Sequence, residues 1–537
     1  MIRILLSRNR CFLISVKMLI IILVCSACNQ DSIHFFPTNT FSIPTVSPSS
    51  RPTGAPNTTN STNSVTVTPR ISYHIDVHPT ELRGSIIHFW HPWSGSAGTL
   101  IQALVEDFNL HNEWGIMVVP VLQATQDEIS NNLVASIGTG DMPDLVVGSP
   151  HQYLEWNEMI KLLDLSPYED DAAWGLSLEE QADFNPVVWE QDVLDGKRLG
   201  IPAQRSAQVL FYNQTWAKSL GFKDPPASPE QFMEQACSAA HHSRQDNDPS
   251  NDGSGGYLVS HDYATMLGWI YSFGGEVIQT PEPGLGKSVY QFNTPEVEET
   301  FIFLRDLYDQ LCAWQSEDQY PLEEFASRQG LFFVGNVMDI PSQVTAFRQE
   351  GNRDTWTVIP FPSPNKSSAV DVFGTSFVIL PSTPQRQLAA WLLIKHLMSP
   401  ENHALLIEET SALPVRSSSL EKLEKFQDQF PQWKAALGLL ALGRSEPFYG
   451  SWSMIRWALS DATRQLFRNY FSVDQVPDLI EYLDDTAAEL HLGPEASGVL
   501  WTSTSTPTIT TTPSKTPTPS PTSKAIKSTQ ASPTPPP

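Results

Sequence analysis

The sequence predicts an α/β fold, because short apolar runs alternate with segments of helical spacing at the start of its folded region. The strand-like runs cover residues 84–90, 116–122 and 143–147, and the helix-like segments cover residues 99–109 and 127–137. In the first helix-like segment Leu100, Leu104 and Phe108 recur at helical spacing. Strands that alternate with helices favour a parallel sheet whose faces are covered.

Two segments of biased composition flank this region. Residues 35–70 are rich in Pro, Ser, Thr and Asn, and residues 502–537 consist almost wholly of Thr, Ser, Pro and Lys. Neither segment holds enough apolar surface to offset the loss of chain entropy on folding, and Pro-rich chains form extended spacers. Within the 537 residues we therefore expect one folded region, from about Gly84 to Leu492.

The charge of the chain argues against nucleic acid as a partner. It carries 33 Lys and Arg against 59 Asp and Glu, a formal net charge of -26. A surface of that sign repels DNA and anionic lipid headgroups. The chain also has 15 Trp, 13 Tyr and 26 Phe residues. A large core accounts for most of these aromatic residues, although Trp also lines carbohydrate and apolar pockets.

The N-terminus has the features of an export signal. Its basic region contains Arg3, Arg8, Arg10 and Lys17. The apolar run that follows, residues 18–24, is too short to span a bilayer as a helix. The next residues, Cys25-Ser26-Ala27-Cys28, resemble a bacterial lipobox, so we expect residues 1–27 to be a lipoprotein signal peptide and Cys28 to carry lipid. The alternatives are an ordinary signal peptide cut nearby and an uncleaved anchor.

Several separated motifs follow one another between residues 84 and 460. They are FWHPWSG (89–95), GTGDMPD (138–144), GKRLGIP (196–202), LFYN (210–213), GG (274–275), FNTPE (292–296), LMSPE (397–401) and LPV (413–415). In this order and spacing they resemble the extracellular solute-binding proteins of ABC importers, in the class that takes sugars and oligosaccharides. Each motif is weak alone, and the series is specific.

The resemblance implies a two-lobed, periplasmic-binding-protein-like fold of type II, with crossover strands at the hinge and C-terminal helices. The expected organisation is a signal peptide (1–27), a linker (28–83), the first part of lobe 1 (84–203), lobe 2 (204–358), the return part of lobe 1 (359–418), C-terminal helices that close the cleft (419–501) and a disordered tail (502–537). The ligand lies between the lobes, and closure replaces solvent with ligand contacts. Because open α/β sheets bind ligands beyond the carboxyl ends of strands, the loops after Trp90 and Val147 should face the cleft.

Two tryptophans are candidate ligand contacts by this resemblance. Trp93 and Ser94 follow the first strand, where the family often places ligand contacts. Trp452 matches the start of a C-terminal helix that carries a sugar-stacking Trp in maltose-type members, and Tyr449 lies just before it. A flat aromatic ring suits the apolar face of a sugar. For both tryptophans the alternative is a place in the core.

Further candidate ligand residues are Asp262, Tyr263, Asn336, Met338 and Thr375. The first two occupy a loop that faces the cleft in the family, and the next two follow an apolar strand where maltose-type members have a stacking aromatic. Met338 is not aromatic, and the loop after Val147 lacks the Trp and Asp-Arg of those members, so the sequence departs from maltodextrin binders. Arg205 near the crossover is either an anion-binding group or a surface hinge charge.

Two of the five cysteines remain after export and lipidation. Cys11 and Cys25 leave with the signal and Cys28 takes lipid, which leaves Cys237 and Cys312, both on segments predicted to be helical. An even pair outside the cell favours a disulfide. The alternative is two buried free thiols.

No metal, cofactor or catalytic site is expected. Residues 248–253 resemble the opening of a calcium loop, but the twelfth position is Val259 in place of the required Glu. A polar turn is therefore the favoured interpretation. Residues 284–288 resemble part of a phosphate loop whose first Gly is replaced by Pro281, and the zinc-protease and serine-hydrolase motifs are missing from the sequence.

The sequence thus predicts a monomeric lipoprotein on the outer face of the cytoplasmic membrane. It would capture a neutral sugar or oligosaccharide, deliver it to the permease subunits of an ABC importer, and catalyse nothing. Two alternatives stay open. One is a glycoside-acting enzyme, which needs opposed carboxylates across the cleft. The other is a surface sensor or adhesion module with the same fold.

Overall fold

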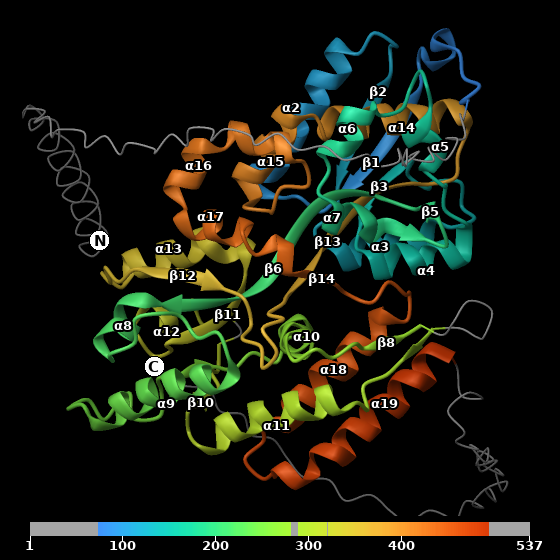
Figure 1. Ribbon diagram of the computed structural model, residues 1–537. Coiled ribbons are helices and arrows are strands. Elements are labelled where there is room, and N and C mark those ends of the chain that lie inside the picture. The colour runs from blue at the N-terminus through green and yellow to red at the C-terminus, as the bar shows by residue number, and fades with distance from the viewer. Residues whose placement is uncertain (1–73, 281–287, 319, 493–537) are drawn as a thin grey trace, which may run out of the picture. The chain divides into compact units, whose positions relative to one another are not determined.

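The computed structural model describes residues 74–280, 288–318 and 320–492, all within one compact unit (Figure 1). The signal peptide, Cys28, most of the expected linker and the expected tail lie outside the described residues. Within the described ranges, no helix is both long enough and apolar enough to cross a membrane.

The amino-terminal elements match the expected alternation of strands and helices. They are η1 (Pro79–Leu82), β1 (Ile86–His91), α2 (Gly95–His111), β2 (Met117–Leu122), α3 (Gln126–Ser136), β3 (Leu145–Gly148) and α4 (Pro150–Ile160). The three strands and the first two long helices were all predicted from the sequence pattern, and the structure confirms them.

A short irregular region then leads to a long strand. It contains α5 (Ser166–Asp170), α6 (Leu178–Asp183), α7 (Pro186–Trp189), η2 (Glu190–Asp192), β4 (Val193–Leu194), β5 (Lys197–Arg198) and β6 (Ile201–Asn213).

The middle of the chain builds the other half of the molecule. Its elements are α8 (Gln214–Ser219), α9 (Pro229–Gln245), β7 (Tyr257–Leu258), α10 (Tyr263–Ser272), β8 (Ile278–Gln279), β9 (Val289–Tyr290), α11 (Pro295–Asp309), β10 (Ala313–Trp314), α12 (Leu322–Ala326), β11 (Phe332–Asn336), η3 (Val337–Asp339), α13 (Ile340–Gln349) and β12 (Trp356–Ile359). We call the part around β1–β3 the first lobe and the part around β7, β11 and α9–α11 the second lobe.

The remaining elements return to the first lobe and then to the second. They are β13 (Val370–Ile379), α14 (Pro384–Leu397), α15 (Pro400–Thr410), η4 (Ser417–Lys422), α16 (Glu424–Gln429), α17 (Pro431–Leu437), η5 (Leu440–Leu442), β14 (Gly443–Ser445), α18 (Trp452–Leu466), η6 (Val473–Gln475) and α19 (Val476–Leu492). The segment expected to form one group of cleft-closing helices is therefore divided. Phe426 and Trp433 of α16 and α17 join the core cluster that extends from the first lobe to β11, α13 and β12, and α17 packs on β12, whereas α18 and α19 pack on α10 and α11 in the second lobe.

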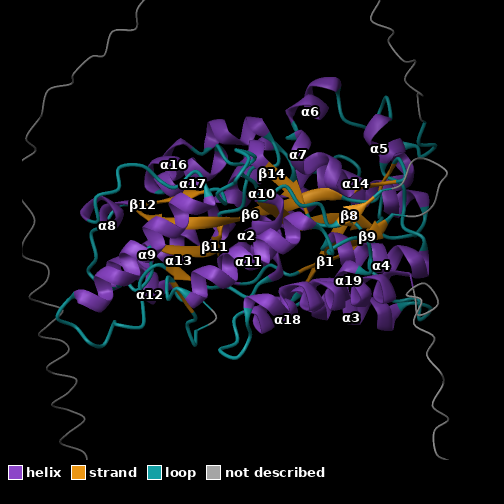
Figure 2. Cartoon of the chain, turned by 60° about the horizontal axis from the view of Figure 1, so that its bottom comes forward, coloured by secondary structure: helices purple, strands orange, loops and turns teal. Residues whose placement is uncertain are grey.

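One sheet runs through both lobes, in the order β10-β7-β11-β6-β13-β3-β1-β2. β1 pairs in parallel with β2 and β3, and β13 pairs antiparallel with β3 and β6. The first half of β6 pairs with β13, and its second half pairs with β11 and β12. Figure 1 shows β6 as one long strand between the two halves, and helices cover both faces of the sheet (Figure 2).

The side chains of β6 serve two cores at once. All of its residues are buried. Val209 and Phe211 belong to the cluster that extends from the first lobe, whereas Leu210 and Tyr212 belong to the cluster of the second lobe. This division follows from the period of two along a strand, which sends neighbouring side chains to opposite faces.

A disulfide joins Cys237 of α9 to Cys312, with Cα atoms 4.4 Å apart. The expectation that both cysteines lie on helices is wrong for Cys312. Helix α11 ends at Asp309, and Cys312 lies in the bend before β10. Its carbonyl accepts a hydrogen bond from the backbone N–H of Tyr257 at 2.9 Å, so this bend belongs to the β7–β10 pairing.

The acidic turn after α9 has the geometry of an Asx turn. Oδ1 of Asp248 accepts hydrogen bonds from the backbone N–H and the hydroxyl of Ser250, at 3.0 and 2.6 Å. Asp246 accepts from the backbone N–H of Asp248 at 2.7 Å and from the side-chain amide of Asn251 at 2.9 Å. These contacts agree with the polar turn favoured from the sequence. In the described ranges no three His, Cys, Asp or Glu residues gather in a metal-binding arrangement.

Candidate functional site

A cavity of about 480 Å³ lies where the two lobes meet the crossing strands. It is lined by Pro92, Gln126, Ser149, Pro150, His151, Glu190, Gln191, Val193, Gln204, Arg205, Ser206, Tyr263, Met338, Val372, Phe373, Gly374, Thr375, Ser445, Glu446, Phe448 and Arg456. The loops after β1 and β3 contribute to this lining, as expected for the carboxyl ends of parallel strands. The volume falls within the range of about 300–1,000 Å³ typical of small-molecule sites.

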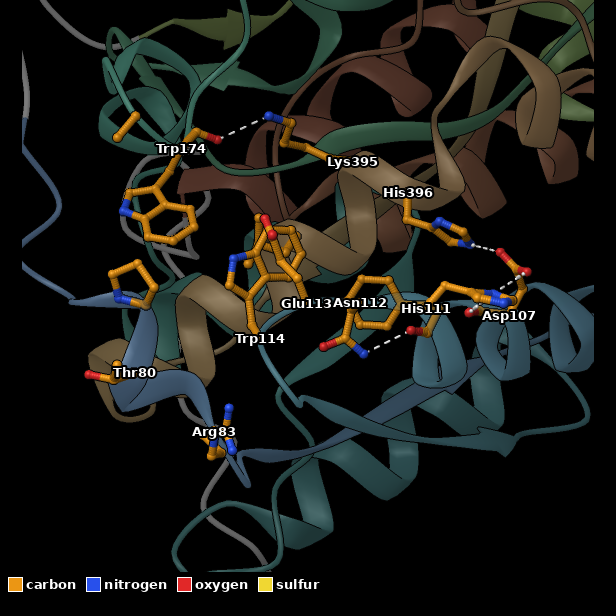
Figure 3. A pocket seen from close by; sticks show the side chains of 14 residues that line it. Thr80, Arg83, Asp107, His111, Asn112, Glu113, Trp114, Trp174, Lys395 and His396 are labelled. Carbon is orange, nitrogen blue, oxygen red and sulfur yellow. Dashed lines mark hydrogen bonds and ion pairs between the residues drawn. The ribbon is translucent and has the colours of Figure 1, made fainter.

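A second and larger hollow, of about 880 Å³, is open to the surface of the first lobe (Figure 3). Trp114 and Trp174 lie in it with their rings edge to face, 6.1 Å between centroids. Several of its charged groups already have protein partners. Lys395 donates to the carbonyl oxygens of Trp174 and Gly175, at 3.2 and 2.7 Å, and His111 contacts Asp107 at 2.9 Å. Lys395, His111 and Asp107 are therefore already engaged by the protein.

The interlobe cavity concentrates buried polar atoms that have no hydrogen-bond partner in the described protein. They are Nε2 and Oε1 of Gln126, Nε2 of His151, Nε2 of Gln204, Oγ1 of Thr375, Oε1 of Glu446 and Nε of Arg456. Buried polar atoms of native proteins are almost always paired, because an unpaired one costs free energy. The lining thus presents several donors and acceptors to whatever occupies the cavity, and none of the residues around the outer hollow has such an atom.

Arg205 is neither an anion-binding group nor a surface charge, because the protein engages all of its N–H donors. Nε donates to Gln191 at 2.7 Å, and Nη1 donates to the backbone carbonyls of Gln204 and Thr375. Nη2 donates to Oδ2 of Asp192 at 2.9 Å and to the Ser376 hydroxyl at 3.0 Å. A guanidinium has five N–H donors in a fixed fork, so none is left for a ligand.

The partner of Arg205 is equally enclosed. Asp192 and Arg205 are both 0% exposed. The other carboxylate oxygen of Asp192 accepts hydrogen bonds from the Tyr153 hydroxyl at 2.6 Å and from the Ser376 hydroxyl at 2.8 Å. This buried ion pair joins η2, α4, β6 and β13 at the wall of the cavity.

Arg456 supplies the free cationic group of the cavity. Its guanidinium lies 5.5 Å from the ring centre of Tyr263 and 5.4 Å from that of Trp457. Among the described residues it forms no ion pair. The neighbouring His151 is neutral, since burial first and the charge of Arg456 second lower the pKa of its imidazole to about 3.

Three carboxyl groups gather on the side of the cavity near β14. Burial raises the pKa of Glu446 to about 7, and the charge of Asp262 adds to this effect. Asp371 on β13 is fully buried, and neither of its carboxyl oxygens has a hydrogen-bond partner among the described residues. Burial, then Glu446 and Asp262, raise its pKa well above the usual range. Asp262 keeps contact with solvent, and the dense protein around it also raises its pKa. Burial first, and the repulsion between the carboxylates second, therefore favour the protonated forms of Glu446 and Asp371.

Three of the candidate residues from the sequence line the cavity, namely Tyr263, Met338 and Thr375. Asn336 lies one step behind the lining, where its Oδ1 accepts a hydrogen bond from the hydroxyl of Ser206. Asp262 caps the amino end of α10 by accepting from the backbone N–H of Ala264 at 2.8 Å.

The two tryptophans lie behind the lining. Trp93 is buried and its indole N–H donates to Oε1 of Gln204 at 2.5 Å, so it orients a lining residue. Trp452 is 0% exposed, which favours the core alternative that its sequence position left open. Ser94 is exposed at the start of α2, and Tyr449 packs on the second core cluster, its ring against Tyr290.

Sequence reasoning missed several lining residues that carry the free polar atoms: Gln126, His151, Gln204 and Glu446. His151 had a usable signal, because it lies in the loop after Val147 that was expected at the cleft. Arg456 lies in the same short run as Trp452. Gln126, Gln204 and Glu446 have no pattern around them that distinguishes them from other polar residues.

A two-lobed α/β protein with a polar and aromatic cavity between its lobes is a binding protein in architecture. The model of the family described as bacterial extracellular solute-binding protein matches residues 103–437, more than half of the 537 residues. The chain therefore belongs to that family, whose members are extracytoplasmic solute-binding proteins. A protein named as a binding protein in Brucella abortus (strain 2308) is 22% identical over 369 residues, 68% of this chain and 82% of its own.

Solved structures agree with the two-lobed fold. The sugar-binding protein MalE from Xanthomonas citri aligns with a TM-score of 0.63 and 21% identity, over 76% of this chain and 97% of its own. UgpB from Mycobacterium tuberculosis, solved with glycerophosphocholine, aligns with a TM-score of 0.60 and 17% identity, over 75% of this chain and 98% of its own. The predicted periplasmic-binding-protein-like fold is confirmed.

Proposed function

We propose that this protein is a lipid-anchored receptor that captures a neutral sugar or oligosaccharide in the interlobe cavity and delivers it to an ABC importer. The observation that carries this proposal is the set of buried polar atoms in the lining that have no partner among the described residues, beside partly buried aromatic rings. Hydroxyl groups of a sugar both donate and accept, so they suit the unpartnered amide atoms of Gln126 and Gln204 and the hydroxyl of Thr375.

The apolar part of the lining supports the same class of ligand. Tyr263, Phe373, Phe448 and Met338 line the cavity and are only partly buried. A sugar presents apolar C–H faces between its hydroxyl rims, and aromatic rings cover such faces well. MalE of Xanthomonas citri, named as a sugar-binding protein, has the same fold.

The charges of the lining favour a neutral ligand over an anion. All five N–H donors of Arg205 are engaged, one by Asp192 and four by other protein acceptors, which leaves Arg456 as the cation of the described lining without an ion-pair partner. Glu446 and Glu190 also line the cavity and oppose a second negative charge. A phosphate ester usually requires more than one cationic or backbone N–H group.

A thermal-shift screen tests the ligand class. Saturating neutral mono- and oligosaccharides should raise the melting temperature, because a ligand that binds only the folded state stabilises by RT ln(1 + [L]/Kd), about 2.7 kcal/mol at 100 Kd. Glycerophosphocholine, amino acids and short peptides serve as comparison ligands. Stabilisation by amino acids or peptides alone would reject the sugar proposal.

Fractionation of cells that express the full chain tests the anchor. The wild-type protein should sediment with membranes and take up labelled fatty acid, whereas Cys28→Ser should lose the label and leave the membrane fraction. Acyl chains bind bilayers by about 0.8 kcal/mol per buried CH₂, so their loss should release the protein. Equal labelling of both proteins would contradict a lipid at Cys28.

The proposal also holds that the protein catalyses nothing. The enzyme alternative requires two carboxyl groups that flank a glycosidic bond. Glu190 and Glu446 are the acids of the lining, and Oε2 of Glu446 is already engaged by Trp452. Sugars recovered unchanged after long incubation would agree with a receptor, and hydrolysed products would favour the enzyme. The sensor or adhesion alternative predicts ligand binding without coupling to importer subunits.

A further inference from the structure

Trp452 lies too deep to touch a ligand, yet its polar atom is aimed at the cavity lining. The residue is 0% exposed and belongs to the core of the second lobe. Its ring lies parallel to that of Tyr290, at 10° and 6.1 Å between centroids, and edge to face with Tyr263 at 5.8 Å. These contacts fix the indole in one orientation. Its N–H then donates to Oε2 of Glu446 at 2.9 Å.

Glu446 lies between Trp452 and the interlobe cavity: it accepts the indole hydrogen bond and lines the cavity. It follows directly after β14, whose residue Ser445 pairs with Val372 of β13, and both of these residues line the cavity. While Oε2 is held by Trp452, Oε1 is buried and has no partner among the described residues. Glu446 forms no ion pair with the neighbouring Arg456 in the part of the chain that the structure describes. One carboxyl oxygen is thus held by the core and the other remains for a ligand.

We propose that Glu446 is a specificity-determining residue that accepts a hydrogen bond from a ligand hydroxyl, and that Trp452 is the positioning residue that holds it in place. The free Nε of Arg456 lines the same cavity and is a donor. A hydroxyl-rich ligand that can donate to Glu446 and accept from Arg456 satisfies both groups. This inference rests on the proposed sugar-binding function of the same cavity.

The surroundings of Glu446 predict how its role depends on pH. Asp262 and Tyr263 face it from α10, Asp371 from β13, and Arg456 from α18, while Tyr271 and Tyr290 lie within its electrostatic reach. Burial raises the pKa of Glu446 to about 7, whereas the Trp452 hydrogen bond and Arg456 oppose that rise. A carboxylate accepts a hydroxyl proton more strongly than a neutral carboxyl group. Ligand affinity should therefore increase as pH rises through about 7.

The first measurement is the affinity for maltose by calorimetry on both sides of neutral pH. Trp452→Phe keeps an aromatic ring but removes the N–H, and should weaken binding about tenfold, as expected for one hydrogen bond to a charged group. Glu446→Gln should weaken binding and remove the pH dependence.

Trp433→Phe is the matched control. Trp433 is equally buried and donates to the backbone carbonyl of Ser411 at 3.0 Å, within the other core cluster. It should lose a similar amount of stability and keep wild-type affinity.

The second measurement needs no ligand, and it separates this inference from the proposed function. Because the pKa of Glu446 is raised in the folded state, its protonated form favours folding, and stability falls as pH rises from the ordinary Glu range through about 7. In Trp452→Phe the loss of the hydrogen bond raises that pKa further, so the fall should extend to higher pH. Glu446→Gln should remove this part of the profile, and Trp433→Phe should leave it unchanged.

If maltose and the other sugars fail to bind the wild type, the proposed function fails, and the ligand-free pH profiles still decide whether Trp452 controls Glu446. Wild-type affinity and an unshifted profile in Trp452→Phe would overturn the inference even if sugars bind. A tenfold loss shared equally by Trp433→Phe would also overturn it, because the effect would then belong to general destabilisation.

Discussion

Replacing Asp192 with asparagine should lower the free energy of unfolding by about 3–5 kcal/mol, the usual cost of breaking a buried ion pair. The substitution leaves the Arg205 guanidinium fully buried without its counter-charge. In the wild type the hydroxyls of Tyr153 and Ser376 donate to the Asp192 carboxylate, and the substitution puts an amide in its place. An amide can present an oxygen to one side only, so at least one of the present donors would lose its acceptor.

This prediction is measured by denaturation with urea and by melting temperature, which should fall by about 3–6 °C given the unfolding entropy per residue of globular proteins. Asp461→Asn is the matched control, because Asp461 pairs with Arg464 on the surface, where the two side chains are 68% and 47% exposed. It should cost less than about 1 kcal/mol. Equal effects of the two substitutions would show that the Asp192–Arg205 pair has no special place in the fold.

Loss of the disulfide should destabilise the protein by about 4 kcal/mol. Cys237 and Cys312 are 75 residues apart in sequence, and the entropy of a loop that long in the unfolded chain gives roughly this value. The paired replacement Cys237→Ala with Cys312→Ala should lower the melting temperature. A reducing agent should do the same to the wild type and have no further effect on the double variant.

The position of the disulfide makes this test specific. The bond joins α9 to the start of β10 in the second lobe, and neither cysteine lines the interlobe cavity. Ligand affinity of the folded fraction should therefore stay at the wild-type value. A loss of affinity at temperatures well below unfolding would indicate that the second lobe needs the bond to keep the cavity in shape.

Much of the fold could be predicted because its signals are local. The alternation from residue 84 to 147 depends on neighbouring apolar residues, and β1, α2, β2, α3 and β3 appear within a few residues of their predicted bounds. The division of the C-terminal segment could not be predicted in this way. α16–α17 and α18–α19 are all amphipathic, and only the surfaces already formed by other elements decide which core each one covers.

The candidate site shows the same limit for side chains. Tyr263, Met338 and Thr375 line the cavity because the elements that carry them meet the crossing strands. Trp93 and Trp452 each lie behind one lining residue, Gln204 and Glu446 respectively, to which the indole N–H donates. The sequence alone does not reveal which way a tryptophan ring points. No sequence pattern marks Glu446, because its raised pKa arises from burial and from Asp262, which comes near it only in the folded chain.

Strand β6 prevents the two lobes from being separated into independent domains. It is an inner strand of the sheet, with partners on both sides, and its side chains complete a core on each face. Neither half can be excised and kept as an autonomous module, because whichever half loses residues 201–213 loses the centre of its sheet. The two halves must therefore fold and persist as one unit.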